Sequence, residues 1–130
     1  MIFICRILSI FAKNTGMIIL DKQISRTELS ELAHNFYEDM IKGVVDVRLH
    51  LLALDAELHS DLESMLLEEG SNQEDLWGIN LYPEMEGEDF IEFDSLINIR
   101  PRQGNRSRDV EDEAIREQIR QVVDKFMIKQ

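Results

Sequence analysis

The sequence has little of the residue types that divide or cross-link a chain: its 130 residues include two prolines, six glycines and one cysteine. So little proline and glycine argues against linkers and low-complexity segments, and we find no internal repeat. A chain of this length fits one domain. Cys5 has no second cysteine with which to form an internal disulfide, and this favours a reducing, cytoplasmic location.

Long apolar runs and cofactor motifs are also missing. No apolar run reaches the roughly 20 residues that a membrane-spanning helix needs, so we expect no contact with a membrane. The sequence has no GxGxxG, no GxxxxGK followed by Ser or Thr, no HExxH and no CxxC. A nucleotide-cradling loop and a structural zinc site are therefore not supported, and we predict neither a cofactor nor a metal.

The first sixteen residues are apolar and carry two positive charges. They are too short for a membrane span, and Arg6 interrupts the run that a signal peptide would need. We therefore expect the natural protein to start at Met17, with 1–16 as an upstream extension of the reading frame and 17–130 as a single α+β domain. A peripheral apolar helix and a membrane anchor are the alternatives for 1–16.

Basic residues are absent from the middle of the chain. The net charge is −12, and residues 49–99 contain fourteen acidic residues without one Lys or Arg. Residues 100–108 follow with four arginines and no acid. Such a strongly negative field repels nucleic acid at long range, so we disfavour nucleic acid as a partner.

The hydrophobic pattern predicts the element order β-α-β-β-α-β-β-α. Capping boxes at Ser25 and Ser60 mark two helix starts, and Asp109 or Asp112 caps a third helix. The predicted helices cover 25–40 and 58–70, and a third runs from its cap at Asp109 or Asp112 to about 126. The predicted strands cover 18–20, 43–47, 49–56, 76–82 and 90–99, although 43–56 could also form one long strand. Hairpin connections favour an α+β fold with a largely antiparallel sheet and helices on one face.

Three passages resemble a family of small uncharacterised prokaryotic proteins, a domain of unknown function. They are DAELHSD at 55–61, QEDLWGINLYP at 73–83, and EFDSLINIRP at 92–101, which continues through NRSR at 105–108 and VED at 110–112. The resemblance runs from about Met17 to the C-terminus and implies a shared fold, with no assigned activity. One departure is Glu113, where the family pattern favours proline.

The arginine-rich segment is the first candidate site. Guanidinium groups recognise carboxylate and phosphate through paired hydrogen bonds, and the following helix offers free backbone N–H groups. The candidate anion-binding residues are Arg100, Arg102, Asn105, Arg106 and Arg108. The alternative is that these arginines pair with the acidic stretch of their own chain or of a second subunit.

Three residues are weak candidates for catalytic proton transfer: Glu57, His59 and Asp94. Glu57 and His59 alternate with Asp61, a spacing that could also suit a metal in an extended segment. The competing interpretation is a strand-to-helix junction, because the capping box at Ser60 draws Asp61 into a helix. Asp94 shares the polar face of the last strand with Glu92, and this face could simply be solvated.

The leading hypothesis is a non-enzymatic cytoplasmic binding or assembly protein, as a homodimer or with a small anionic ligand. Its arginine segment and its acidic surface are complementary in charge. One alternative is a small enzyme that acts on a phosphorylated or carboxylated metabolite. The other is a toxin-like or RNA-binding module, against which the acidic stretch argues. The sequence does not decide whether the protein is an enzyme.

Overall fold

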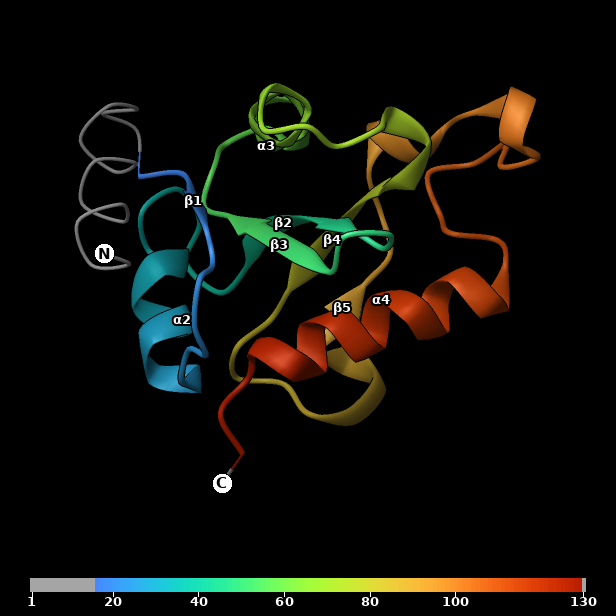
Figure 1. Cartoon of the computed structure of the whole chain (residues 1–130). Coiled ribbons are helices and arrows are strands. Elements are labelled where there is room, and N and C mark those ends of the chain that lie inside the picture. Colours follow the sequence, from blue (N-terminus) through green and yellow to red (C-terminus); the bar gives the residue numbers. More distant parts are fainter. Residues whose placement is uncertain (1–15, 130) are drawn as a thin grey trace.

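The computed structural model describes residues 16–129, so the prediction for 1–16 lies, except for Gly16, outside the described residues. The strands are β1 (Ile18–Ile19), β2 (Ile41–Asp46), β3 (Leu51–Leu54), β4 (Leu76–Leu81) and β5 (Ile91–Glu92). The helices are α2 (Arg26–Ala33), α3 (His59–Glu68) and α4 (Glu113–Phe126) (Figure 1). The predicted α+β class and the order β-α-β-β-α-β-β-α are confirmed.

The five strands form one sheet in the order β1-β3-β2-β4-β5, and every neighbouring pair is antiparallel. Asp46 closes the β2–β3 hairpin, because its Oδ1 accepts the backbone N–H groups of Arg48 and Leu49, each at 2.8 Å. Its Oδ2 accepts the Ser71 hydroxyl at 2.6 Å, so this buried carboxylate has donors on both oxygens. The antiparallel sheet predicted from the hairpin pattern is therefore confirmed.

The helices cover both faces of the sheet, which corrects the prediction that they lie on one face. α2 and α4 pack against odd-numbered side chains of β2 and β4, including Val45 and Ile79. α3 packs against even-numbered ones, including Val44 and Leu76. Figure 1 shows α3 above the sheet and α4 below it. The central strands are apolar on both faces, so each face needs a helix to cover it.

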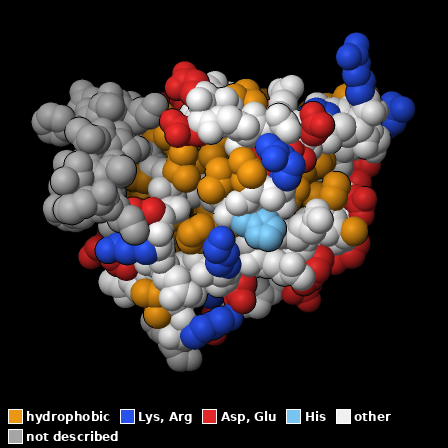
Figure 2. All heavy atoms as spheres, in the orientation of Figure 1, with side chains coloured by type: hydrophobic (Ala, Val, Ile, Leu, Met, Phe, Trp, Pro, Cys, Tyr) orange, Lys and Arg blue, Asp and Glu red, His pale blue; other side chains and the backbone are white. Residues whose placement is uncertain are grey.

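The face of the sheet under α3 is covered less completely than the face under α2 and α4. Met17, Ile19 and Leu51 pack against the α3 cluster and are only partly buried. Figure 2 shows hydrophobic side chains at the surface just below α3.

Two of the three predicted helix caps are confirmed. Ser25 forms the full capping box with Glu28, and Asp112 accepts the N–H of Ala114 at 2.8 Å. The prediction of a capping box at Ser60 is wrong. α3 begins at His59, with Leu58 at the N-cap and no side-chain hydrogen bond to cap it. The His59 side chain bonds the Ile79 carbonyl, and this contact holds His59 in the first helical turn.

Two predicted elements are shorter than expected. α2 ends at Ala33 and not near residue 40, since Asn35 hydrogen-bonds Asp55 and the chain turns there. The strand predicted over 90–99 pairs only at Ile91–Glu92. Beyond it Ser95 accepts the N–H of Ile97, so a local side-chain bond replaces the strand ladder.

Candidate functional site

Arg100 faces the sheet, although it is the first arginine of the predicted anion site. Its guanidinium lies 4.2 Å from the ring centroid of buried Trp77 and donates to the carbonyls of Gln73 and Leu76. Burial lowers the pKa of this guanidinium, although it stays charged at neutral pH. Arg100 therefore fastens the segment 100–108, called here the arginine loop, to the start of β4.

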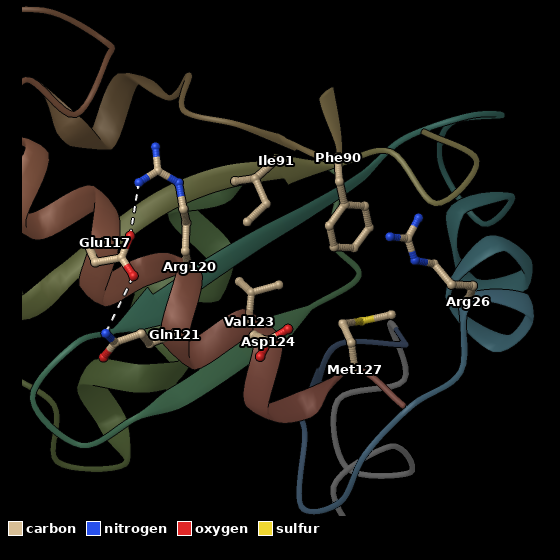
Figure 3. A pocket seen from close by; sticks show the side chains of 9 residues that line it. All are labelled: Arg26, Phe90, Ile91, Glu117, Arg120, Gln121, Val123, Asp124 and Met127. Carbon is tan, nitrogen blue, oxygen red and sulfur yellow. Dashed lines mark hydrogen bonds and ion pairs between the residues drawn. The ribbon is translucent and has the colours of Figure 1, made fainter. Parts of the chain in front are cut away.

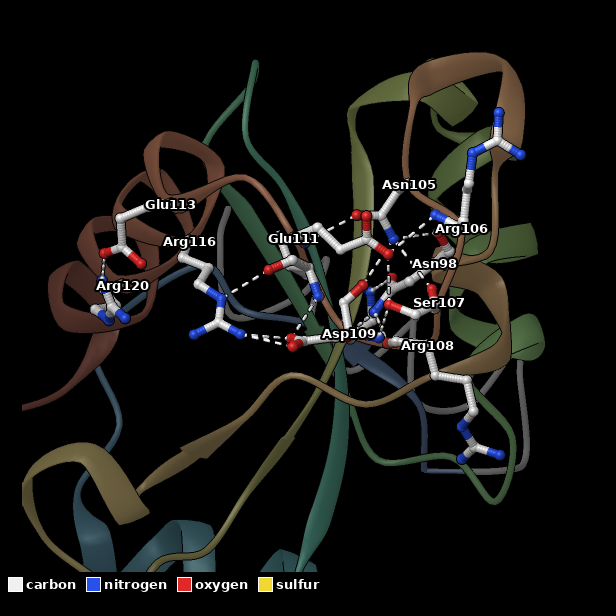
Figure 4. Close-up of polar contacts among 12 residues, drawn as sticks. Asn98, Asn105, Arg106, Ser107, Arg108, Asp109, Glu111, Glu113, Arg116 and Arg120 are labelled. Atoms are coloured by element: carbon white, nitrogen blue, oxygen red, sulfur yellow. Dashed lines mark hydrogen bonds and ion pairs between the residues drawn. The ribbon is translucent and has the colours of Figure 1, made fainter.

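Two buried asparagines hold the arginine loop from within (Figure 4). Asn98 accepts the N–H of Gly78 at 2.8 Å and donates to the carbonyls of Gly78 and Arg108. Asn105 donates to the carbonyls of Asn98, Ser107 and Asp109. Its Oδ1 accepts the N–H of Glu111, so both amide ends of Asn105 are used by the protein itself.

The other three arginines diverge. Arg108 pairs with Asp94 at 2.6 Å on the surface. Figure 4 shows the guanidinium of Arg106 pointing away from that of Arg108. The exposed side chains of Arg102 and Arg106 make no hydrogen bond or ion pair with another residue of 16–129. The geometry therefore offers no shared anion clamp among the four, and anion binding by the arginine loop alone stays a prediction.

A row of polar side chains crosses three strands on the α3 face of the sheet. Lys42 of β2 pairs in register with Asn80 of β4, and Asn80 pairs with Glu92 of β5. Directly opposed residues in an antiparallel pair have Cβ atoms about 5 Å apart. Lys42, Asn80 and Glu92 are called the polar row below.

Asn80 is the buried centre of the polar row, with 4% of its surface exposed. Its amide donates to Glu92 Oε1 at 2.9 Å and to the carbonyl of Asp94 at 3.3 Å. Both partners only accept, so they fix the orientation of the amide. Asn80 Oδ1 then lies buried without a hydrogen-bond partner, which costs free energy in a folded protein.

Lys42 contributes a half-buried ammonium to the polar row. The ammonium nitrogen lies 5.3 Å from the ring centroid of Tyr37, and this nitrogen makes no hydrogen bond or ion pair within residues 16–129. Burial lowers the pKa of Lys42, as does Arg108, while Asp94 and Glu92 raise it. Lys42 is thus a partly desolvated cation within electrostatic range of both carboxylates of β5 and its extension.

Glu92 is already engaged by other side chains. Its Oε1 accepts the Tyr82 hydroxyl at 2.9 Å as well as the Asn80 amide. Burial, together with the bond to Glu92, raises the pKa of Tyr82 to about 12. Since Glu92 has these donors and Asp94 has Arg108, neither carboxylate is paired with Lys42.

His59 lies above the polar row in the first turn of α3. It is 7% exposed, and its Nε2 lies 2.8 Å from the carbonyl oxygen of Ile79. Burial lowers the pKa of His59 to about 4, against the weaker raising effects of the Ile79 carbonyl, Asn80 and Asp94. The ring is therefore neutral at pH 7.

The structure brings together part of the predicted catalytic set. His59 and Asp94 both lie within electrostatic range of Lys42, and Arg108 joins them through Asp94. Glu57 is exposed, and its backbone carbonyl accepts the Tyr37 hydroxyl at 2.7 Å. An extended segment would be needed to place Glu57, His59 and Asp61 on one face. Instead α3 begins at His59, and of these three side chains only that of His59 is buried.

Sequence reasoning did not single out Lys42 or Asn80. Each occupies an even-numbered position in a strand whose odd-numbered positions are apolar, so alternation could have placed each side chain on the α3 face. Their pairing depends on the register between β2 and β4, and the sequence pattern did not determine it.

A separate hollow of about 320 Å³ lies between α4 and β5 (Figure 3). Phe90, Val123 and Met127 form part of its wall. The cations at this hollow are already engaged: Arg26 stacks on Phe90 and donates to two backbone carbonyls, and Arg120 pairs with two glutamates. We therefore place the candidate site at the polar row and not here.

Residues 16–129 lack two features that would point to a metal or a membrane. No group of three or more His, Cys, Asp or Glu side chains is arranged to hold a metal ion. No helix in this part of the chain has the length and apolar character needed to cross a bilayer.

The fold and its polar row define a small α+β protein with one antiparallel sheet between helices. The family model described as a protein of unknown function, DUF5674, matches residues 18–126, and the chain belongs to this family. The family resemblance seen in the sequence is thereby confirmed. No curated protein and no solved structure matches the chain.

Proposed function

We propose that the protein is a binding module for a small carboxylated or phosphorylated molecule, which it holds at Lys42 in the polar row. The observation that supports the proposal is the half-buried Lys42 ammonium, which has no ion-pair partner within residues 16–129. Asn80, opposite Lys42 in the sheet, adds a second unsatisfied polar group, because its buried Oδ1 has no hydrogen-bond partner. Perturbed and unsatisfied polar groups cluster at functional sites.

Among the charged groups around the polar row, Lys42 is the cation without an ion pair inside residues 16–129. Glu92 is held by Asn80 and Tyr82, and Asp94 by Arg108. Asn80 and Tyr82 are neutral donors, so Glu92 keeps its formal charge, and Lys42 is the cation of this group that forms no ion pair within residues 16–129. An ammonium that is partly removed from water interacts with an anion more strongly than an exposed lysine does.

This site lies at the margin of the arginine loop and not within it. Arg108 takes part through its ion pair with Asp94, and Arg100 and Asn105 act as structural supports. The proposal therefore keeps the anionic ligand that the sequence suggested and moves its binding site onto the sheet.

The test uses backbone NMR spectra of the whole chain titrated with sulfate, phosphate and acetate. We expect saturable shifts at Lys42, Asn80 and Glu92, and a loss of affinity of about tenfold or more in Lys42→Met. Lys125→Met is the matched control, because Lys125 is an exposed lysine whose ammonium also lies over an aromatic ring, 5.1 Å from the Phe126 centroid. Shifts confined to Arg102 and Arg106 would contradict the proposal.

Self-association is a second candidate function, and one observation favours it. Leu96 is 67% exposed and Ile99 is 41% exposed, and both lie next to the arginine loop. The outward Arg102 and Arg106 could meet the exposed acidic side chains near Glu84–Asp89 of a second copy. Light scattering at about 10 μM should then report a dimer, and Leu96→Asp with Arg106→Glu should return it to a monomer. A monomer in the unchanged protein would remove this candidate.

A further inference from the structure

His59 has two hydrogen-bond acceptors as neighbours, but its neutral ring has a single N–H to give. The Ile79 carbonyl, 2.8 Å from Nε2, can only accept, so Nε2 carries the hydrogen. In a neutral imidazole the other nitrogen, Nδ1, is then bare. The tautomer of His59 is thus set by the backbone of β4.

The second acceptor is the side chain of Asn80. Its amide nitrogen is committed to Glu92 and Asp94, so its free oxygen is the group available to the ring. That oxygen is buried without a partner, and the Asn80 side chain favours the protonated form of His59. A proton on Nδ1 would give Asn80 Oδ1 the donor that it lacks, and both acceptors would be satisfied at once.

Burial and one neighbouring charge keep that proton off the ring. Burial is the largest effect on the pKa of His59, and Lys42 on β2 lowers it further. Asp94, in the segment after β5, raises it. Within residues 16–129 these two are the charged groups that act on the ring, and Lys42 is also the cation of the proposed ligand site.

We infer that an anion bound at Lys42 draws a proton from solvent onto Nδ1 of His59, so that ligand binding and proton uptake are linked. This inference rests on the proposed function. A bound anion compensates the Lys42 charge that opposes protonation, and it adds its own attraction for the imidazolium. By thermodynamic reciprocity the proton strengthens anion binding by the same factor.

The experiment is an NMR titration of the histidine ring signals of the whole chain, with and without sulfate, an anion whose charge stays constant across this pH range. We expect sulfate to raise the pKa of His59 by about one unit. By linkage, sulfate affinity should rise about threefold between about pH 7 and pH 4.5. The ring signals of the exposed His34 and His50 are internal controls that added sulfate should leave unshifted at a fixed pH.

A His59→Gln variant separates the ring from the carboxylates of the site. Glutamine can still donate an N–H to the Ile79 carbonyl but cannot take up a proton, so the part of the pH dependence that this variant loses belongs to His59. Sulfate that saturates the Lys42 signal without moving the His59 titration would overturn the linkage and leave the proposed function standing. Sulfate that leaves Lys42 unperturbed would overturn both.

Discussion

The guanidinium of Arg100 covers the indole of Trp77, with 4.2 Å between Cζ and the ring centroid, and the same group donates to the carbonyls of Gln73 and Leu76. One side chain thereby ties the arginine loop, the turn before β4 and the core to each other. Trp77, at 2% exposure, depends on this contact for part of its cover.

Replacing Arg100 should therefore cost stability and not only charge. Arg100→Lys keeps the charge but cannot donate to both carbonyls in the fixed guanidinium geometry, so we expect a loss of about 2 kcal/mol in the free energy of unfolding. Urea denaturation followed by the fluorescence of Trp77, the single tryptophan, measures it. Arg102→Lys is the control and should change stability by less than about 0.5 kcal/mol. Equal effects of the two changes would contradict the structural role of Arg100.

Gly78 should not accept a side chain. A Cβ built at Gly78 would lie 2.5 Å from Ser95 Cβ and 2.6 Å from Ser95 Oγ. We expect Gly78→Ala to destabilise the protein by about 2–3 kcal/mol through overpacking. The double variant with Ser95→Gly removes both contacting atoms, so a double-mutant cycle should return a coupling energy of at least about 1 kcal/mol. Additive effects would show that the close approach of Gly78 and Ser95 does not limit this position.

Asn105→Asp should loosen the arginine loop. The substitution replaces an amide that donates to three carbonyls, at 2.8, 3.1 and 2.7 Å, with an oxygen that can only accept. We expect a loss of about 3 kcal/mol and faster hydrogen exchange at the Glu111 amide, which Asn105 normally accepts. Asn72→Asp is a matched control, because Asn72 is exposed and its side chain makes no cap hydrogen bond. Unchanged exchange at Glu111 would refute this role.

Stability should fall in mild acid because of His59. The pKa of His59 is about 4 in the folded protein and about 6.5 when it is unfolded, so the unfolded state binds more protons between these values. The contribution is complete above about pH 6.5 and is lost as the pH falls to about 4, a total of about 3 kcal/mol. Chemical denaturation at several pH values should show this slope in the native protein and a weaker slope in His59→Gln.

Asp55 affects the pH dependence of stability in the direction opposite to His59. Burial raises its pKa, partly offset by the bond from Asn35, so the cost of its charge is relieved when acid protonates it. An Asp55→Asn variant should therefore retain the loss of stability that His59 causes in acid and lack the gain from Asp55 that offsets it. Its stability should fall more steeply with decreasing pH than that of the unchanged protein. A shallower fall would mean that the assignment of the two groups is wrong.

The sequence predicted elements well where one local signal acted alone. Ser25 with Glu28 marked the start of α2, and the 3.6-residue periodicity of α4 agrees with the observed helix. It predicted less well where side chains bond to backbone. The alternation over 90–99 indicated a strand, but Ser95 and Asn98 use their own polar atoms in place of a ladder.

The candidate site was predictable only in part, for a related reason. His59, Asp94 and Arg108 were singled out from residue type and local spacing, and the structure places all three within electrostatic range of Lys42. Lys42 and Asn80 became conspicuous only through the β2–β4 register, which is a long-range property. Arg100 and Asn105 were expected to face a ligand, but they are satisfied by backbone carbonyls that lie close by only in the folded chain.

The way in which Asn98 pairs with Gly78 has a consequence for the behaviour of the protein at high concentration. β5 covers only the end of β4, at Asn80 and Leu81. Along the rest of that edge, the Asn98 amide forms hydrogen bonds with the backbone N–H and carbonyl of Gly78, and the Arg100 guanidinium donates to the carbonyl of Leu76. At the opposite edge of the sheet, β1 is two residues long. Within residues 16–129, therefore, neither margin of the sheet presents a long open row of donors and acceptors to which a strand of another molecule could add, and amyloid-like growth of the folded state lacks a template.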